Sequence, residues 1–194
     1  MFVSNCNSTK NVLILEGCRI IYLRTKMKVS NTVPADLSTI YELFEASIEY
    51  QEKNGVPVWR NYDRNAIVQD IEEKTQFKIE IDNMLAIVFS IRYSDKIIWR
   101  HLDNGDAVYL HRIVVNPLFK GKRLFGNVLN WAIDHAREKK LSAVRMDTWA
   151  NNPNIIQYYK SFGFTFVEDY TTPDTIELPI HNRKLPLTLL EYKV

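Results

Sequence analysis

The stretch that decides the fold is AVYLHRIVVNPLFKGKRLFGN, residues 107–127. It opens with nine mostly apolar residues, which predict a buried strand. Pro117 then marks a bend, a basic loop with Gly121 follows, and the apolar spacing beyond it predicts a helix over about 121–140. At such a junction the loop amides and the positive end of the helix dipole converge, so the sequence predicts an anion site.

The cations of this loop are Lys120, Lys122 and Arg123, which surround Gly121. Their side chains and the free amides could hold a pyrophosphate, although a basic helix start can also be a solvated surface feature. A nucleotide P-loop is excluded because the Gly-Lys-Ser/Thr ending is absent. A dinucleotide-binding fingerprint is excluded because two of its three glycines are missing.

The composition is that of one globular domain. The chain has 194 residues, of which 46% are hydrophobic and 25% charged, and its formal charge is +2. This charge gives no general attraction to nucleic acid or to a membrane surface. No apolar run reaches the roughly 18–20 residues that span a bilayer. Cys6 and Cys18 do not predict a disulfide framework, so a reducing, cytoplasmic location is expected.

The order of elements predicts a single mixed α/β domain over residues 27–194. Residues 1–26 are interpreted as an N-terminal extension, either a strand or loosely ordered. Helices are expected over about 36–53, 63–71, 121–140 and 151–162 from helical spacing, caps and the terminal Gly163. Strands are expected over about 27–33, 77–81, 84–92, 107–115, 143–149, 164–168 and 187–192.

Two motifs in this order resemble the GCN5-related N-acetyltransferase (GNAT) superfamily. The first is the strand YLHRIVVNP with the loop FKGKRLF and its long helix. The second is the strand VRMDTW followed by NPNIIQYYKSFGF, residues 152–164. The resemblance covers residues 28–194 in element order and 107–168 in motif detail. It implies a mixed, mostly antiparallel sheet with two parallel splayed strands, about four flanking helices, and acetyl-CoA bound between the splayed strands.

The resemblance also implies which residues hold the cofactor. The pantetheine arm would lie like an added strand along Ile113, Val114 and Val115. The pyrophosphate would lie on the loop and helix start, at Lys120, Gly121, Lys122, Arg123, Leu124, Phe125 and Gly126. The family loop is Arg/Gln-x-x-Gly-x-Gly/Ala, and its two small positions fall on Arg123 and Phe125 here. The chain therefore departs from the family pattern at both small residues.

The second motif resembles the family helix Asn-x-x-Ala…Tyr-x-x-x-Gly-Phe, with Ile155 in place of the Ala. The match implies that Asn152 contacts the cofactor and that Tyr159 lies near the thioester sulfur. A phenol of pKa about 10 can protonate the leaving CoA thiolate. The alternatives are that Tyr159 only packs the helix against the sheet, or that its neighbour Tyr158 acts instead.

A general base is also expected, because an amine of pKa about 10 is mostly protonated at neutral pH. Strand alternation predicts that Tyr109 and His111 share one face with Ile113 and Val115. Arylalkylamine acyltransferases of the superfamily resemble this strand in having a histidine at the position of His111, which implies a base. A lone strand histidine can equally be a core residue. The substitutes are His101, Glu49 and Asp147.

The predicted acceptor is a small amine held by the aromatic side chains Trp59, Tyr62, Trp99 and Tyr109. Packing between helices is the alternative role of Trp59. No metal-ligand cluster and no nucleophilic Ser or Cys arrangement is visible in the sequence, so direct attack without an acyl-enzyme is predicted. Two alternatives stay open: a non-catalytic acyl-CoA sensor on the same fold, and a protein lysine or N-terminal acetyltransferase. A homodimer is also left open.

Overall fold

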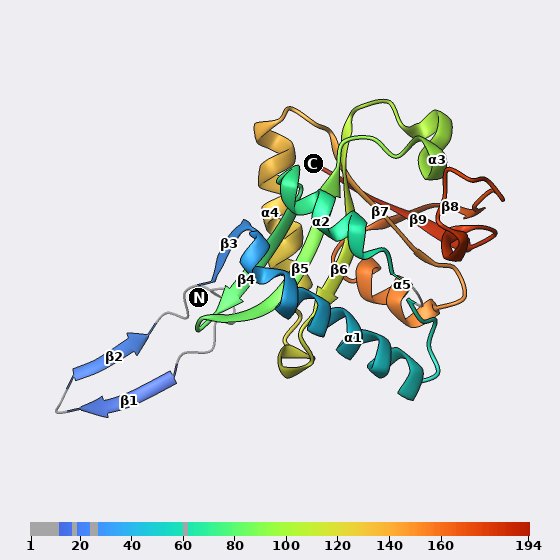
Figure 1. Cartoon of the computed structure of the whole chain (residues 1–194). Coiled ribbons are helices and arrows are strands. Elements are labelled where there is room, and N and C mark those ends of the chain that lie inside the picture. Colours follow the sequence, from blue (N-terminus) through green and yellow to red (C-terminus); the bar gives the residue numbers. More distant parts are fainter. Residues whose placement is uncertain (1–11, 17–18, 24–26, 60–61) are drawn as a thin grey trace.

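The structure is a computed structural model that describes residues 12–16, 19–23, 27–59 and 62–194. Its centre is a seven-stranded sheet of order β3-β4-β5-β6-β7-β9-β8 (Figure 1). The strands are β3 Lys28–Asn31, β4 Gln76–Ile81, β5 Met84–Arg92, β6 Ala107–Val115, β7 Ala143–Trp149, β8 Thr165–Thr171 and β9 Pro186–Lys193. The pair β6–β7 is parallel and the other neighbours are antiparallel, which confirms the predicted fold class.

The described residues form five α-helices, one more than predicted. They are α1 Leu37–Lys53, α2 Arg64–Glu72, α3 Lys96–Trp99, α4 Phe125–Glu138 and α5 Pro153–Lys160. The added helix, α3, has a single turn capped by Asp95, a length too short for a helical period to show in the sequence. Upstream, β1 Val12–Glu16 and β2 Arg19–Leu23 pair with each other as a separate two-stranded sheet.

Helices cover both faces of the sheet. On one face α1 and α2 pack through a cluster that includes Ile40, Phe44 and Ile67, and this cluster reaches Val114 of β6. On the other face α4 buries a stripe formed by Val128, Leu129, Ala132, Ile133 and Ala136. The helix α5 packs against the start of α4, where the ring of Tyr159 meets that of Phe125 edge-on at 4.8 Å. Among the described residues no helix is long and apolar enough to cross a bilayer.

The helix α4 begins at Phe125, four residues later than predicted. The reason lies in the backbone of the preceding loop, where Gly121 has φ of 77° and Arg123 has φ of 52°. These left-handed conformations cannot belong to a right-handed helix. Lys120, Gly121, Lys122 and Arg123 therefore form a loop, and the helix starts beyond them.

A β-bulge changes the facing of the second half of β6. Val114 pairs with Val88 and His111 pairs with Ser90, so two residues of β6 stand opposite one residue of β5. The bulge includes Arg112, whose φ is 49°. As a result Leu110 and Ile113 pack in the same core cluster below α4.

The bulge overturns one sequence prediction. Tyr109 packs in a different cluster from Ile113 and Val115, so it does not share a face with them. The prediction assumed unbroken alternation along the strand, and the extra residue of the bulge reverses that alternation.

The two parallel strands separate halfway along their length. They pair from Ala107 with Ala143 to Leu110 with Met146, and the pairing stops there. From His111 on β6 and Asp147 on β7 the strands diverge. This divergence opens the sheet at its centre and positions the site described next.

Candidate active site

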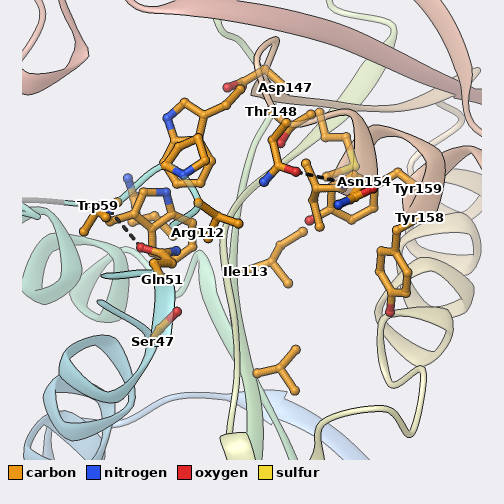
Figure 2. Close-up of a pocket in the computed structure, with 18 of the residues that line it drawn as sticks. Ser47, Gln51, Trp59, Arg112, Ile113, Asp147, Thr148, Asn154, Tyr158 and Tyr159 are labelled. Atoms are coloured by element: carbon orange, nitrogen blue, oxygen red, sulfur yellow. Dashed lines mark hydrogen bonds between the residues drawn. The ribbon is translucent and has the colours of Figure 1, made fainter. Parts of the chain in front are cut away.

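A cavity of about 920 Å³ occupies the gap between the diverging strands (Figure 2). Figure 2 shows Gln51 of α1 and Trp59 on one side of it and Tyr158 and Tyr159 of α5 on the other. Residues of β6 and β7 form the wall between them. The cavity is therefore bounded by the elements on which the sequence placed the cofactor and catalytic residues.

The edge of β6 facing β7 is free of backbone pairing beyond Leu110 in the described chain. Of the residues expected on this edge, Ile113 and Val115 line the cavity. Val114 does not, because the bulge turns its side chain into the α1–α2 cluster, where it is buried. An extended ligand could add to this edge as a further strand.

The basic loop reaches the cavity through one residue. Lys120 lines it, donates to the hydroxyl of Tyr50 and lies 3.6 Å from the centre of that ring. Lys122 lies over the ring of Phe119, and Arg123 donates to Ser161 Oγ at 3.0 Å. The other expected cofactor residues of the loop do not line the cavity: Gly121, Lys122, Arg123, Leu124, Phe125 and Gly126.

Two of these residues have core roles instead. Leu124 and Phe125 are buried, and Phe125 makes ring contacts with Tyr159 and Phe162 of the α5 region. Phe125 at the second small position thus fills the junction of α4 and α5. Arg123 at the first small position keeps the left-handed backbone that normally favours glycine.

The helix α5 brings Asn152 and Tyr159 to the cavity wall. Asn152 caps the helix, its Oδ1 accepting the Ile155 backbone N–H at 3.3 Å. Burial raises the pKa of Tyr159, and the nearby Tyr158 and Asp147 raise it further. The phenol of Tyr159 therefore keeps its proton at neutral pH.

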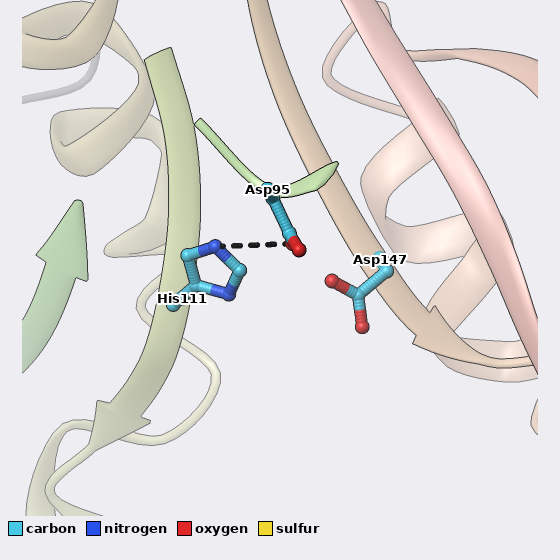
Figure 3. A group of neighbouring side chains, drawn as sticks. All are labelled: Asp95, His111 and Asp147. Carbon is cyan, nitrogen blue, oxygen red and sulfur yellow. Dashed lines mark ion pairs between the residues drawn. The ribbon is translucent and has the colours of Figure 1, made fainter. Parts of the chain in front are cut away.

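His111, Asp95 and Asp147 form a cluster that joins three elements (Figure 3). His111 Nε2 lies 3.6 Å from Asp95 Oδ2, and one ligand atom from each residue lies within 4.8 Å of the others. His111 and Asp147 line the cavity, whereas Asp95 stands behind them on the turn before α3. Such a set of one imidazole and two carboxyl groups could share protons or hold a cation, which the sequence alone did not indicate.

Burial disfavours every charge in this cluster. It lowers the pKa of His111 to about 3, with help from the charges of Arg112 and Arg92. It raises the pKa of Asp147 to about 7, to which the charge of Asp95 adds. Burial and the charge of Asp103 raise the pKa of Asp95 to about 6. His111 is therefore a neutral imidazole at neutral pH, and it faces two carboxyl groups whose ionisation changes near neutral pH.

A second polar network supports the bulge. Asp70 of α2 is fully buried and accepts from Ser90 Oγ at 2.6 Å and from Arg112 Nε at 3.0 Å. It also forms an ion pair with Arg92. Asp70 thus anchors Arg112, the bulged residue between His111 and Ile113. No local pattern indicated this role, because Asp70 lies 42 residues from Arg112 and resembles any helix-surface carboxylate.

Of the four aromatic residues predicted to hold the acceptor, the structure brings Trp59 to the cavity. Trp59 lines the cavity, and its ring centre lies 5.8 Å from that of Trp149, a lining residue that sequence reasoning missed. Tyr62 does not line it, since its hydroxyl donates to Glu45 and its ring stacks on Phe44.

Trp99 and Tyr109 are buried in a core cluster and do not line the cavity either. The hydroxyl of Tyr109 donates to Asp103 at 2.9 Å and accepts from Arg145 at 3.1 Å. Both rings therefore belong to the core below the site, and the predicted acceptor residues Tyr62, Trp99 and Tyr109 lie outside the cavity.

Two of the substitutes for the base also lie elsewhere. Glu49 is exposed and forms an ion pair with Lys53 at 2.6 Å. His101 lies in the exposed turn after α3. Neither lines the cavity, whereas Asp147 does.

Comparisons with known proteins agree with this geometry. A family model described as "Acetyltransferase (GNAT) family" matches residues 41–164. The Bacillus subtilis protein "Uncharacterized N-acetyltransferase YesJ" is 25% identical over 140 residues, which cover 68% of this chain and 78% of that protein.

Solved structures share the fold. A GNAT-family acetyltransferase from Listeria monocytogenes superposes with a TM-score of 0.71 at 23% identity, over 87% of this chain and 95% of that one. YncA from Salmonella typhimurium, solved with its cofactor acetyl-CoA, superposes with a TM-score of 0.59 at 20% identity, over 86% of this chain and 93% of that one. Since the family model spans more than half of the chain and most of the residues that line the cavity, the chain belongs to the acetyltransferase (GNAT) family.

Proposed function

We propose that this protein transfers the acetyl group of acetyl-CoA to the nitrogen of a small amine. The observation that carries the proposal is the cavity at the divergence of β6 and β7, whose wall combines an unpaired strand edge with Tyr159, His111 and Asp147. A thioester placed on that edge would have a proton donor and proton acceptors within one cavity.

The described residues fit acetyl-CoA in three respects. The volume of about 920 Å³ falls in the range typical of ligand sites. The free edge at Ile113 and Val115 matches the amide groups of a pantetheine arm, which can pair as a strand does. Lys120 at the cavity wall offers a positive charge for the phosphates, and Asn152 also lines the cavity.

In the proposed reaction the amine nitrogen attacks the carbonyl carbon of the thioester. The new N–C bond forms, the C–S bond breaks, and the nitrogen gives up a proton to His111 or, beside it, Asp147. The leaving sulfur takes a proton from the hydroxyl of Tyr159, which solvent then reprotonates. No covalent bond to the protein forms at any step, so the products are the acetylated amine and CoA as a thiol.

A small acceptor is favoured over a protein side chain by the walls of the cavity. Trp59 and Trp149 line it next to each other, and Leu185 from the segment before β9 lines it as well. A flat apolar amine would pack against these side chains, and its ammonium form would be attracted by Asp147.

A non-catalytic acyl-CoA sensor is the second candidate. It is favoured by the departure from the family loop, since Arg123 and Phe125 occupy its two small positions here. Neither side chain lines the cavity, and Phe125 is part of the core. The sensor would bind acetyl-CoA but would not need the proton donor and acceptors that line the cavity.

Steady-state thiol release separates the two candidates. Purified protein is mixed with acetyl-CoA and a panel of aromatic, aliphatic and polyamine acceptors, and a lysine peptide is included as a protein-like acceptor. Isothermal calorimetry measures acetyl-CoA binding in parallel. Thiol release that depends on a small amine supports the proposal. Binding without release supports the sensor, and release with the peptide alone would refute the small-acceptor assignment.

A further inference from the structure

Asp95 has no role in the scheme above, yet its surroundings are unusual. It stands on the turn between β5 and α3, and its side chain is 14% exposed. One carboxylate oxygen caps α3 by accepting the Ile98 backbone N–H at 3.4 Å. The other, Oδ2, is buried without a hydrogen-bond partner and points to His111 Nε2, which is equally buried and without a hydrogen bond.

Two buried atoms of complementary chemistry at 3.6 Å are an arrangement that folding alone does not favour. A buried polar atom without a partner typically costs about 1–3 kcal/mol. The distance is slightly too long for a hydrogen bond and short enough for a strong electrostatic interaction if the imidazole becomes charged. The pair would therefore be satisfied when His111 carries an additional proton.

The other charged groups around the pair determine which carboxylate can stabilise a protonated His111. Arg112 and Arg92 oppose a charge on His111, but both are tied to the buried Asp70. Asp103 accepts the backbone N–H of Asp95 and keeps a like charge nearby. Asp147 stands at the cavity wall. Asp95 is thus the carboxylate held closest behind the imidazole, on the side away from the ligand space.

We propose that Asp95 is a positioning residue that orients His111 and stabilises the imidazolium formed when His111 takes the proton of the acceptor amine. The inference rests on the proposed acetyl transfer, in which Asp95 and His111 would act together as a dyad. The dyad depends on the turn before α3, which places Asp95 beside His111 of β6.

The proton balance of the dyad is simple. As the N–C bond forms, one N–H proton of the amine moves to the free imidazole nitrogen, and His111 becomes positively charged. The adjacent Asp95 carboxylate offsets that charge without accepting the proton itself. After acetyl transfer His111 releases the proton to solvent, and the sulfur of CoA carries the proton supplied by Tyr159.

The variant Asp95→Asn tests the dyad with little risk to the fold. Asparagine is as good a helix cap as aspartate, so α3 should keep its start while the charge is lost. The matched control is Asp63→Asn, which changes the aspartate cap of α2 away from the cavity. Thermal unfolding checks that both variants are folded.

Kinetics with the best acceptor amine give the main result. We expect Asp95→Asn to lower kcat by about 10- to 10²-fold with an unchanged KM for acetyl-CoA, and Asp63→Asn to match the wild type. In wild type kcat should fall as pH drops through about 6, where Asp95 becomes protonated, and Asp95→Asn should lack that fall. A merely structural role of Asp95 would not remove a pH dependence.

A double-mutant cycle makes the coupling explicit. If Asp95 acts through His111, then adding Asp95→Asn to His111→Gln should lower kcat no further, within about 3-fold. Losses that multiply would overturn the proposal, as would an Asp95→Asn enzyme equal to wild type.

Two further outcomes are decisive. If a chelator abolishes wild-type activity and Zn²⁺ or Mn²⁺ restores it, the cluster is a metal site and the dyad is refuted. If wild type turns over no amine although it binds acetyl-CoA, the acetyl-transfer function itself is refuted. An active wild type with an unaffected Asp95→Asn variant refutes the dyad alone.

Discussion

Leu110 of β6 and Met146 of β7 are the last residues that pair across the parallel strands, and the next residue on each strand, His111 and Asp147, brings a titratable side chain to the cavity. The strand pairing therefore ends where the titratable groups of the cavity begin. A single feature of the sheet both opens the ligand space and supplies its chemistry.

Tyr159→Phe should lower kcat by about 10²-fold or more while leaving acetyl-CoA binding unchanged, because the variant loses the proton donor and keeps the ring that packs on Phe125. Thiol release and calorimetry measure the two quantities. Tyr192→Phe is the matched control, since Tyr192 packs in the core away from the cavity. Equal kcat in Tyr159→Phe and wild type would remove Tyr159 from the mechanism.

Asp147→Asn should make the protein more stable at pH 8 by about 1 kcal/mol, because a buried carboxylate is replaced by a neutral amide. The folded state raises the pKa of Asp147 from 3.8 to about 7. Its contribution to stability is thus fully present below about pH 4 and is lost as pH rises through about 7. Urea unfolding at pH 5 and pH 8 should show a larger difference between variant and wild type at pH 8, and a difference that does not grow with pH would contradict the assignment.

Asp70→Asn should destabilise the protein by about 3 kcal/mol, since it leaves Arg92 and Arg112 without their buried carboxylate. Urea unfolding measures the change. Asp134→Asn provides the control, because Asp134 is exposed in a 3.6 Å pair with Arg137 and its loss should change stability by less than about 0.5 kcal/mol. Similar midpoints for the two variants would show that the Asp70 network does not hold the bulge.

Lys120→Met should weaken acetyl-CoA binding by about 10-fold, whereas Lys122→Met should change it by less than about 2-fold. The reason is position: Lys120 lines the cavity, and Lys122 lies over the ring of Phe119 outside it. A charge-assisted contact to phosphate contributes about 1.5–3 kcal/mol. Calorimetry at two salt concentrations checks both variants, and a larger effect of Lys122→Met would place the phosphates on the other side of the loop.

Much of the fold was predictable from local patterns. The apolar run of β6 and the helical stripe of α4 appear in the sequence because strand and helix periods are local properties. The same holds for α5, where the Asn152 cap and Gly163 mark both ends. The fold class and family followed from the order of these elements, and the structure and family model confirm them.

The site was less predictable because it depends on contacts between distant residues. A positive φ at Arg112 is unexpected for a residue with a side chain, so the bulge and the reversed facing beyond it gave no signal. Asp95, Asp70 and Trp149 reach the site through tertiary packing. The aromatic side chains Trp99 and Tyr109 looked suited to a ligand but fill the core, which aromatic residues do more often.

The most direct test of the central claim is to identify the products by mass spectrometry. Wild-type protein is incubated with acetyl-CoA carrying an isotopically labelled acetyl group and with the amine panel, and the labelled amine and free CoA are quantified. Acetyl transfer predicts labelled N-acetylamine and CoA in equal amounts, both strongly reduced in Tyr159→Phe. Release of CoA without any labelled amine, or bound acetyl-CoA that remains intact with every acceptor, would contradict the account.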